Sequence, residues 1–320
     1  MTLELIDAQS AHQRIAASIV RTPLLPVEAI SQRLGCSVWL KAENLQAIGA
    51  FKARGATNAI FRLSGEAARC GVVTHSSGNH AAAVARAATL RHIDAHIVMP
   101  HNSSPKKMAA VRSFGIEPVV CEPDTDARRA AAESLQKKTG ATMIHPYDNF
   151  DVMAGQATVG LEILEDLPDV DAVVTPVGGG GLAAGILTAV KSLRPDVQVY
   201  GVEPAFADDT ARSLNAGTRQ KPERYDTVAD GLRTQVGELT FPIIQKHLDD
   251  LWLVSENEIL SAMRMIAETA HLVVEPSGAV GLAGVVQSGS QLAGKHVAIV
   301  LTGGNVDMSA CSMGRPSRRQ

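Results

Sequence analysis

The sequence alternates between short apolar runs and longer segments with helical spacing from one end to the other. The apolar runs predict strands at 37–41, 71–75, 95–99, 118–121, 173–177, 197–202, 251–254 and 297–301. The segments between them predict helices at 52–63, 79–90, 104–114, 125–138, 152–167, from 182 onward, 208–215, 240–247, 257–272 and from 277 onward. This alternation is typical of an α/β fold with mostly parallel sheets.

This number of strands indicates two sheets and therefore two lobes. We expect the smaller lobe to be one continuous insert, residues 49–145, and the larger lobe to contain residues 1–48 and 146–320. Neither an internal repeat nor a low-complexity linker separates the two parts.

Composition narrows the class of protein. Hydrophobic residues make up 45% of the chain and aromatic residues only 3%, so we expect a large aliphatic core of parallel strands beneath helices.

A formal net charge of −3 gives no reason to expect a nucleic-acid surface. The sequence shows neither a secretory signal nor an apolar stretch of about 18 residues, so no membrane span is expected. The four scattered cysteines indicate reduced thiols in a cytoplasmic protein rather than disulfides or a zinc site.

Four consecutive glycines, Gly178 to Gly181, lie between an apolar run and a helical run. A glycine loop in this position lets the backbone approach a ligand closely and directs free N–H groups at it, beside the positive end of a helix dipole. A tight turn without a ligand would need fewer glycines, so the tract favours a phosphate-binding loop. It matches neither the dinucleotide fingerprint nor the P-loop.

Lys52 follows the apolar pair Ala50-Phe51 at a predicted turn into a helix. If it is buried, its pKa falls and the neutral, nucleophilic amine is favoured, as Schiff-base chemistry requires. From local sequence alone, a solvated lysine at a helix start is the stronger interpretation.

Two further segments place polar groups at the ends of predicted strands. Residues 76–80, Ser-Ser-Gly-Asn-His, offer hydroxyl, amide and N–H groups that could cap a helix or bind a carboxylate, and both interpretations stay open. Thr302 follows the last apolar run, at the strand end where open α/β sheets bind ligands.

Glu203 and Asp209 lie six residues apart at the end of another predicted strand. Two carboxylates and a backbone carbonyl between them can hold Mg²⁺ or Ca²⁺. By pattern alone, acidic residues at a helix start are the commoner explanation.

Taken together and in this order, these segments resemble the serine/threonine dehydratase and serine racemase family of pyridoxal-phosphate (PLP) enzymes, the fold type II group. The resemblance extends from Arg21 to Asn305. Its most specific elements are the lysine motif, residues 76–80, the tetraglycine and Gly303-Gly304-Asn305. It implies the two-lobed architecture of the tryptophan synthase β type.

The resemblance implies a role for each cofactor residue. Lys52 matches the lysine that forms a Schiff base with PLP, and Phe51 matches the aromatic residue beside the ring. Asn79 matches the asparagine that hydrogen-bonds the 3′-oxygen. The tetraglycine matches the phosphate loop, and Thr302 occupies the position opposite the pyridine nitrogen.

It also implies substrate and cation sites. The substrate-binding turn comprises Ser76, Ser77, Gly78, Asn79 and His80. In racemase members, the serine matching Ser77 acts on the face opposite the lysine. Glu203, the carbonyl of Ala207, and Asp209 match the cation site of serine racemases and related dehydratases, which makes bound Mg²⁺, or else Mn²⁺ or Ca²⁺, the expectation.

The implied reaction is β-elimination of water from a small β-hydroxy amino acid such as L-serine or L-threonine, which yields a 2-oxo acid and ammonia. In that reaction the lysine is the general base, and PLP supplies the electron sink. Three alternatives stay open: serine racemisation, dehydration of 3-hydroxyaspartate with Arg128 as a speculative partner for the second carboxylate, and a non-catalytic PLP-fold binding protein. The family also implies a homodimer.

Three departures from the family pattern bear on these expectations. Ala50 replaces a serine that is usual two residues before the lysine, and Tyr147 replaces residues such as Asn or Phe. The sequence continues only briefly beyond Asp307, so we expect no C-terminal regulatory domain and no control by isoleucine.

Overall fold

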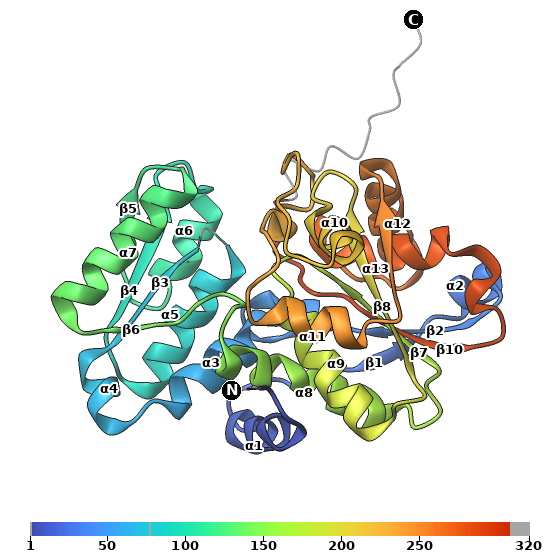
Figure 1. The fold of residues 1–320 in the computed structure, drawn as a ribbon, viewed down its shortest axis with the longest axis horizontal. Helices are drawn as coiled ribbons and strands as arrows, with labels where there is room; N and C mark the ends of the chain where they lie inside the picture. Colours follow the sequence, from blue (N-terminus) through green and yellow to red (C-terminus); the bar gives the residue numbers. More distant parts are fainter. Residues whose placement is uncertain (1, 77, 308–320) are drawn as a thin grey trace, which may run out of the picture.

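The computed structural model describes residues 2–76 and 78–307, and it confirms an α/β architecture built on two sheets (Figure 1). The larger sheet has six strands in the order β1-β2-β10-β7-β8-β9. Neighbouring strands are parallel except for β1 and β2, which are antiparallel. In chain order these strands are β1 (Leu24–Pro26), β2 (Ser37–Lys41), β7 (Ala172–Pro176), β8 (Gln198–Pro204), β9 (Asp250–Val254) and β10 (His296–Val300).

The smaller sheet has four parallel strands in the order β5-β4-β3-β6. They are β3 (Val72–His75), β4 (Ala95–Pro100), β5 (Val119–Cys121) and β6 (Thr142–Met143). All four lie inside the segment 49–145 that the sequence predicts as an insert, and Figure 1 shows this part beside the larger sheet. The domain bounds themselves stay a proposal.

Helices flank both sheets. They are α1 (Leu5–Ile15), α2 (Glu28–Leu34), α3 (Lys52–Arg62), α4 (Gly65–Cys70), α5 (Asn79–Arg91), α6 (Pro105–Arg112), α7 (Thr125–Thr139), α8 (Phe150–Asp166), α9 (Gly181–Leu193), α10 (Asp209–Ala216), α11 (Thr240–His247), α12 (Glu256–Thr269) and α13 (Pro276–Gln287). Short 3₁₀ turns occur at η1 (Glu43–Leu45), η2 (Ala47–Gly49), η3 (Asp230–Leu232) and η4 (Gly289–Leu292). Across the described residues, no helix is both long and apolar enough to cross a membrane.

The larger sheet is buried on both faces. One face packs against α2, α12 and α13, and the other against α8, α9 and α11. Every residue of β7 is buried, which explains its continuous apolar sequence. Helices α8 and α9 approach closely because Gly185 has no side chain; a Cβ there would lie 2.6 Å from the carbonyl oxygen of Met153. This packing fixes α9, which begins at the last residue of the glycine loop.

Candidate active site

The start of α3 is joined to the end of β10 by backbone contacts. Ala50 forms an isolated antiparallel bridge with Gly303, and the N–H of Phe51 donates to the carbonyl of Thr302 at 3.1 Å. The larger sheet therefore brings Lys52 next to Thr302, two positions that lie far apart in the sequence. Thr302 follows the carboxyl end of β10, and α/β sheets bind their ligands at the carboxyl ends of their parallel strands.

Lys52 is half-buried, and its Nζ donates a hydrogen bond to the carbonyl of Pro146 at 2.6 Å. Burial lowers the pKa of the Lys52 amine to about 8. The Nζ atom lies 5.1 Å from the centre of the Phe51 ring. Lys52 is thus not a solvated lysine at a helix start, and its amine is neutral over much of the mildly alkaline range.

The glycine loop ends β7 and begins α9. Among the described residues, no carbonyl or side chain accepts from the N–H groups of Gly178 to Gly181. Gly180 has φ +84°, which L-residues with a side chain rarely adopt. Unpaired N–H groups at the start of a helix fit a phosphate.

Tyr147 packs directly against this loop. A Cβ at Gly179 would lie 2.3 Å from the Tyr147 ring, and one at Gly181 would lie 2.9 Å from the Cβ of Tyr147. Pro146, the acceptor for Lys52, immediately precedes Tyr147 in the chain. Two consecutive residues therefore contact both the lysine and the glycine loop, so both elements border the same site.

Asn79 begins α5 and contacts two residues from distant parts of the chain. Its Nδ2 donates to Glu275 Oε1 at 2.7 Å, and its Oδ1 accepts from Asn305 Nδ2 at 2.9 Å. Burial, together with the negative charge of Asp230, raises the pKa of Glu275 to about 7. Glu275 is a site residue that the local sequence pattern does not predict. A glutamate directly after the apolar residues Val273 and Val274 and before a helix-starting proline was the available signal.

Thr302 is buried just beyond β10, and its hydroxyl donates to the carbonyl of Ser277 at 3.2 Å. Its neighbour Gly303 lies against the Glu275 carboxyl; a Cβ at Gly303 would be 2.4 Å from Glu275 Oε1. A neutral hydroxyl and a carboxyl of raised pKa thus occupy one end of the site, beside Asn79.

The turn before α5 carries the predicted substrate-binding residues. Gly78 is the N-cap, and no side chain caps α5, although Ser76 Oγ accepts from the Gly78 N–H at 3.3 Å. The open first turn of α5 can therefore bind a carboxylate. His80 is buried, with Nε2 3.0 Å from the carbonyl oxygen of Ile144. Burial and the positive charge of Lys52 hold the pKa of His80 well below its ordinary value, so its ring is neutral. Ser77 lies outside the described residues.

The two predicted cation ligands are buried together. Glu203 lies next to the last residue of β8 and accepts from the N–H groups of Thr210 and Ala211, each at 3.1 Å. Asp209 Oδ2 accepts from the Val236 N–H at 2.6 Å, while Asp209 Oδ1 is buried without a hydrogen-bond partner among the described residues. Burial raises the pKa of Glu203 well above its ordinary value and that of Asp209 to about 7.

This donor set fits a hard cation. A divalent ion would relieve the repulsion between two buried carboxylates and satisfy the unpaired oxygen of Asp209, with the Ala207 carbonyl as a further oxygen ligand. No group of three His, Cys, Asp or Glu side chains that could hold a metal occurs in the described part of the chain, so any cation here would take oxygen ligands from the two carboxylates and from backbone.

A short connection links the carboxylate pair to the glycine loop. Val236, which donates to Asp209, precedes Gly237, whose N–H donates to the Gly179 carbonyl at 3.2 Å. Thr240 Oγ1 donates to the same carbonyl at 2.8 Å. Two adjacent residues, Val236 and Gly237, therefore join the carboxylate pair to the glycine loop.

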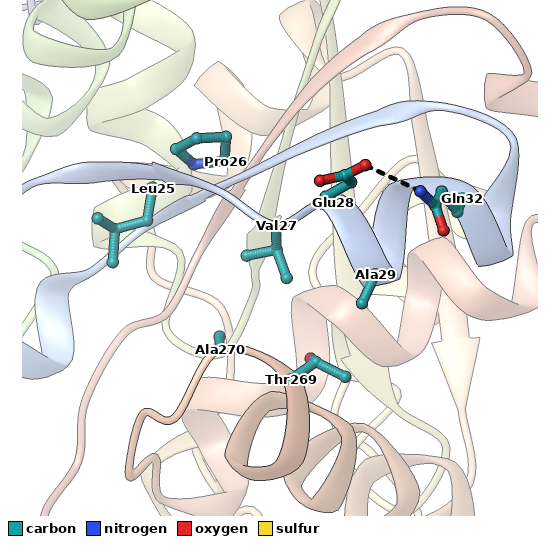
Figure 2. Close-up of a pocket in the computed structure, with 8 residues that line it drawn as sticks. All are labelled: Leu25, Pro26, Val27, Glu28, Ala29, Gln32, Thr269 and Ala270. Carbon is teal, nitrogen blue, oxygen red and sulfur yellow. Dashed lines mark hydrogen bonds between the residues drawn. The ribbon is translucent and has the colours of Figure 1, made fainter.

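A surface pocket of about 650 Å³ lies between β1, α2 and the end of α12 (Figure 2). Its lining includes Glu28, which accepts from Gln32 Nε2 at 2.9 Å. None of the predicted site residues lines it, so it is separate from the site at the strand ends.

Comparison with known proteins gives consistent matches. Residues 15–303 match the family described as pyridoxal-phosphate dependent enzyme. A serine racemase of Dictyostelium discoideum is 42% identical over 97% of each chain. A beta-hydroxyaspartate dehydratase of Paracoccus denitrificans is 40% identical over 94% of this chain and 96% of the relative. The solved structure of maize serine racemase has a TM-score of 0.95 and 39% identity, over 97% of this chain and 96% of that one.

Proposed function

Because the chain belongs to the family of pyridoxal-phosphate dependent enzymes, among its racemases and ammonia-lyases, we propose that it eliminates water from a small β-hydroxy amino acid. L-Serine and L-threonine are the proposed substrates, and a 2-oxo acid and ammonia the products. The observation that carries the proposal is the adjacency of Pro146 and Tyr147, which contact Lys52 and the glycine loop respectively. One cofactor can reach both elements.

The cofactor would be held at its two ends. The N–H groups of Gly178–Gly181 would bind its phosphate, and Lys52 would bind its aldehyde carbon. Asn79 would contact the ring oxygen, Thr302 would lie near the ring nitrogen, and Phe51 would pack beside the ring. When bound, pyridoxal phosphate supplies the electron sink that makes the substrate Cα–H acidic.

Lys52 would also move the proton. Its lowered pKa leaves a neutral amine available to take the proton from the substrate Cα. The substrate carboxylate would bind at the open first turn of α5, at Ser76 and Gly78 to His80, and Ser77 belongs to the same proposed turn. Thr302 supplies no negative charge to the ring nitrogen, which favours rapid loss of the β-hydroxyl over a long-lived carbanion.

We further propose that Glu203, Asp209 and the Ala207 carbonyl hold Mg²⁺, with Mn²⁺ or Ca²⁺ as alternatives. Its role would be structural, because Val236 and Gly237 lie between the pair and the glycine loop. A homodimer, a cytoplasmic location and the division into 1–48 plus 146–320 and 49–145 are also proposals, and they rest on the family resemblance and the sequence.

Dehydration of 3-hydroxyaspartate is the second candidate function, and the position of Arg128 favours it. Burial lowers the pKa of His75, and the Arg128 charge adds to that effect. Burial raises the pKa of Tyr147 to about 12, while the same charge opposes the rise. Arg128 therefore lies within electrostatic reach of both residues, and its guanidinium could pair with a second substrate carboxylate. The relatives named for hydroxyaspartate support this candidate.

Serine racemisation is supported by the relatives named serine racemase. It would use Lys52 on one face of Cα and Ser77 on the other. Both reactions can occur at one site, because they share the removal of the α-proton.

The deciding experiment supplies L-serine, D-serine, L-threonine and 3-hydroxyaspartate separately, and measures both 2-oxo acid release and the appearance of the opposite enantiomer. We expect 2-oxo acid from L-serine or L-threonine, and none from the Lys52→Ala variant. Turnover by Lys52→Ala at the wild-type rate would overturn the proposal. Faster dehydration of 3-hydroxyaspartate would favour the second candidate, and faster enantiomer formation would favour racemisation.

A further inference from the structure

Arg54 lies two residues after Lys52 and belongs to a buried cluster of four charged side chains that anchors α3. Lys41, Glu43 and Arg54 are 0% exposed, and Glu162 is 1% exposed. We call Lys41, Glu43, Arg54 and Glu162 the buried charge cluster. Its two cations and two carboxylates balance.

Arg54 donates all five of its N–H groups. Nε and Nη2 donate to the two oxygens of Glu43 at 2.8 and 2.7 Å. Nη1 and Nη2 donate to the two oxygens of Glu162 at 2.7 and 2.8 Å. The second N–H of Nη1 donates to Thr158 Oγ1 at 3.0 Å. Both carboxylates are thus held in a bidentate manner, which fixes the plane of the guanidinium as well as its position.

The cluster connects four separate elements. Lys41 ends β2, Glu43 lies in η1, Arg54 lies in the first turn of α3 and Glu162 lies in α8. Lys41 Nζ completes the connection by donating to Glu162 at 2.6 Å and to the Thr22 carbonyl at 2.7 Å. The first turn of α3 is therefore fixed to the larger sheet and to α8 at once.

Stability alone does not account for such a cluster. Moving charges out of water costs several kcal/mol per ion, and well-packed apolar side chains of similar volume often stabilise a protein as much or more. What apolar residues cannot reproduce is the directional control of five hydrogen bonds on one planar group. The cluster supplies orientation at the helix turn that carries Lys52.

We propose that Arg54 is a positioning residue, which through the buried charge cluster sets the orientation of the first turn of α3 and thereby aims the Lys52 amine at the cofactor aldehyde. This role rests on the proposed function of Lys52. The amine of Lys52 would condense with the aldehyde of a bound cofactor: a C=N bond would form, the C=O bond would break and one water would leave. Placement of the reacting nitrogen affects that bond and leaves the phosphate contacts of the glycine loop unchanged.

The test compares two ligands of the full-length chain: pyridoxal phosphate, and its analogue with a methyl group in place of the aldehyde. The analogue binds the glycine loop but cannot bond to Lys52. For Arg54→Lys, which keeps the charge but loses the planar fork, we expect pyridoxal phosphate to bind about tenfold more weakly, because small misplacements of reacting groups are costly. Binding of the analogue should stay within about twofold of wild type.

A purely structural role for Arg54 predicts that both ligands lose affinity to the same degree, and that result would overturn the proposal. Unchanged affinity for both ligands would overturn it as well. If Arg54→Lys does not fold, Thr158→Val decides the question. It removes the fifth acceptor of Arg54, together with the hydrogen bond that the Thr158 hydroxyl donates to the Gly155 carbonyl within α8. We expect a smaller selective loss, of about fivefold. No selective loss in Thr158→Val then rejects the positioning role.

Two controls separate this role from the assignment of Lys52. Arg62→Lys, in the last turn of the same helix, alters only an exposed ion pair with Asp151 and should change neither affinity. Lys52→Ala should abolish the preference for the aldehyde form. If Lys52→Ala keeps that preference, the assignment of Lys52 fails and the positioning role fails with it. If Lys52→Ala behaves as expected while Arg54→Lys matches wild type, only the positioning role fails.

Discussion

The side-chain amide of Asn79 donates to the carboxyl of Glu275 at 2.7 Å, although the two residues are 196 positions apart in the chain. The first belongs to α5 beside the smaller sheet, and the second precedes α13 beneath the larger sheet. The contact fixes the amide that is proposed to meet the cofactor. It also gives the site a titratable group near neutral pH.

Glu275 makes stability depend on pH. Burial, aided by Asp230, raises its pKa from 4.5 to about 7, so the folded chain holds a proton that the unfolded chain releases between these values. This stabilisation amounts to about 3 kcal/mol. It is complete below about pH 4.5, and it is lost as the pH rises through 7. Glu275→Gln should therefore flatten the fall in unfolding free energy between pH 5 and 7.5, measured by denaturant titration without cofactor. An unchanged slope would contradict this expectation.

Lys52 should be chemically distinct from the exposed lysines. Its pKa is lowered to about 8 by burial, so its amine is mostly protonated below pH 8 and mostly neutral above it. Modification of the cofactor-free chain by an amine-reactive reagent should show a midpoint near pH 8 at Lys52, read peptide by peptide with mass spectrometry. Saturating pyridoxal phosphate should protect this position. A midpoint at the ordinary value for lysine would mean that Lys52 is solvated.

Gly179→Ala should weaken cofactor binding, because the added Cβ would lie 2.3 Å from the Tyr147 ring and one of the two must shift. We expect a loss of about tenfold to a hundredfold in affinity for pyridoxal phosphate, equivalent to about 1–3 kcal/mol of strain. The double variant Gly179→Ala, Tyr147→Ala should recover part of this loss. Gly65→Ala is the matched control, since nothing lies within 4 Å of its Cβ.

Removal of divalent cations should lower the melting temperature, and added Mg²⁺ should restore it. Asp209, with a pKa of about 7, is mostly protonated at pH 6 and ionised at pH 8, so chelation should have the larger effect at pH 8. Asp209→Asn should remove the response. Asp208→Asn is the control, because Asp208 pairs with Arg212 instead. A melting temperature that is insensitive to exhaustive chelation at both pH values would eliminate the cation site.

Arg128 is expected to discriminate between substrates. Loss of a hydrogen bond between charged groups costs about 1.5–3 kcal/mol, so Arg128→Leu should reduce kcat/KM for 3-hydroxyaspartate by about tenfold to a hundredfold and leave that for L-serine nearly unchanged. Arg129→Leu is the neighbouring control; Arg129 pairs with Asp126 on the surface. An equal loss for both substrates would show that Arg128 does not recognise a second carboxylate.

Elements with a clear local pattern were predicted correctly, whereas very short or weakly patterned ones were missed. Helix α11 has the predicted bounds, and β2 spans the predicted residues. By contrast, β1 and β6 have three and two residues, too few to show a period. Helices α1, α2 and α4 were not predicted either. In α1 the buried residues are Ala8, Ala11 and Ile15, so only one large apolar side chain marks its buried face.

The sequence by itself determined the alternation of strands and helices, the glycine loop and the polar turns, because each depends on residues close together in the chain. Only the tertiary structure decided that Lys52 is half-buried against Pro146, that Glu275 meets Asn79 and that Arg54 lies inside a buried charge cluster. Burial and pairing depend on residues contributed by distant segments, and they set the pKa and orientation of each group. From local sequence, Lys52 was expected to be a surface charge, and the packing of α3 against the sheet and α8 is what changed its chemistry.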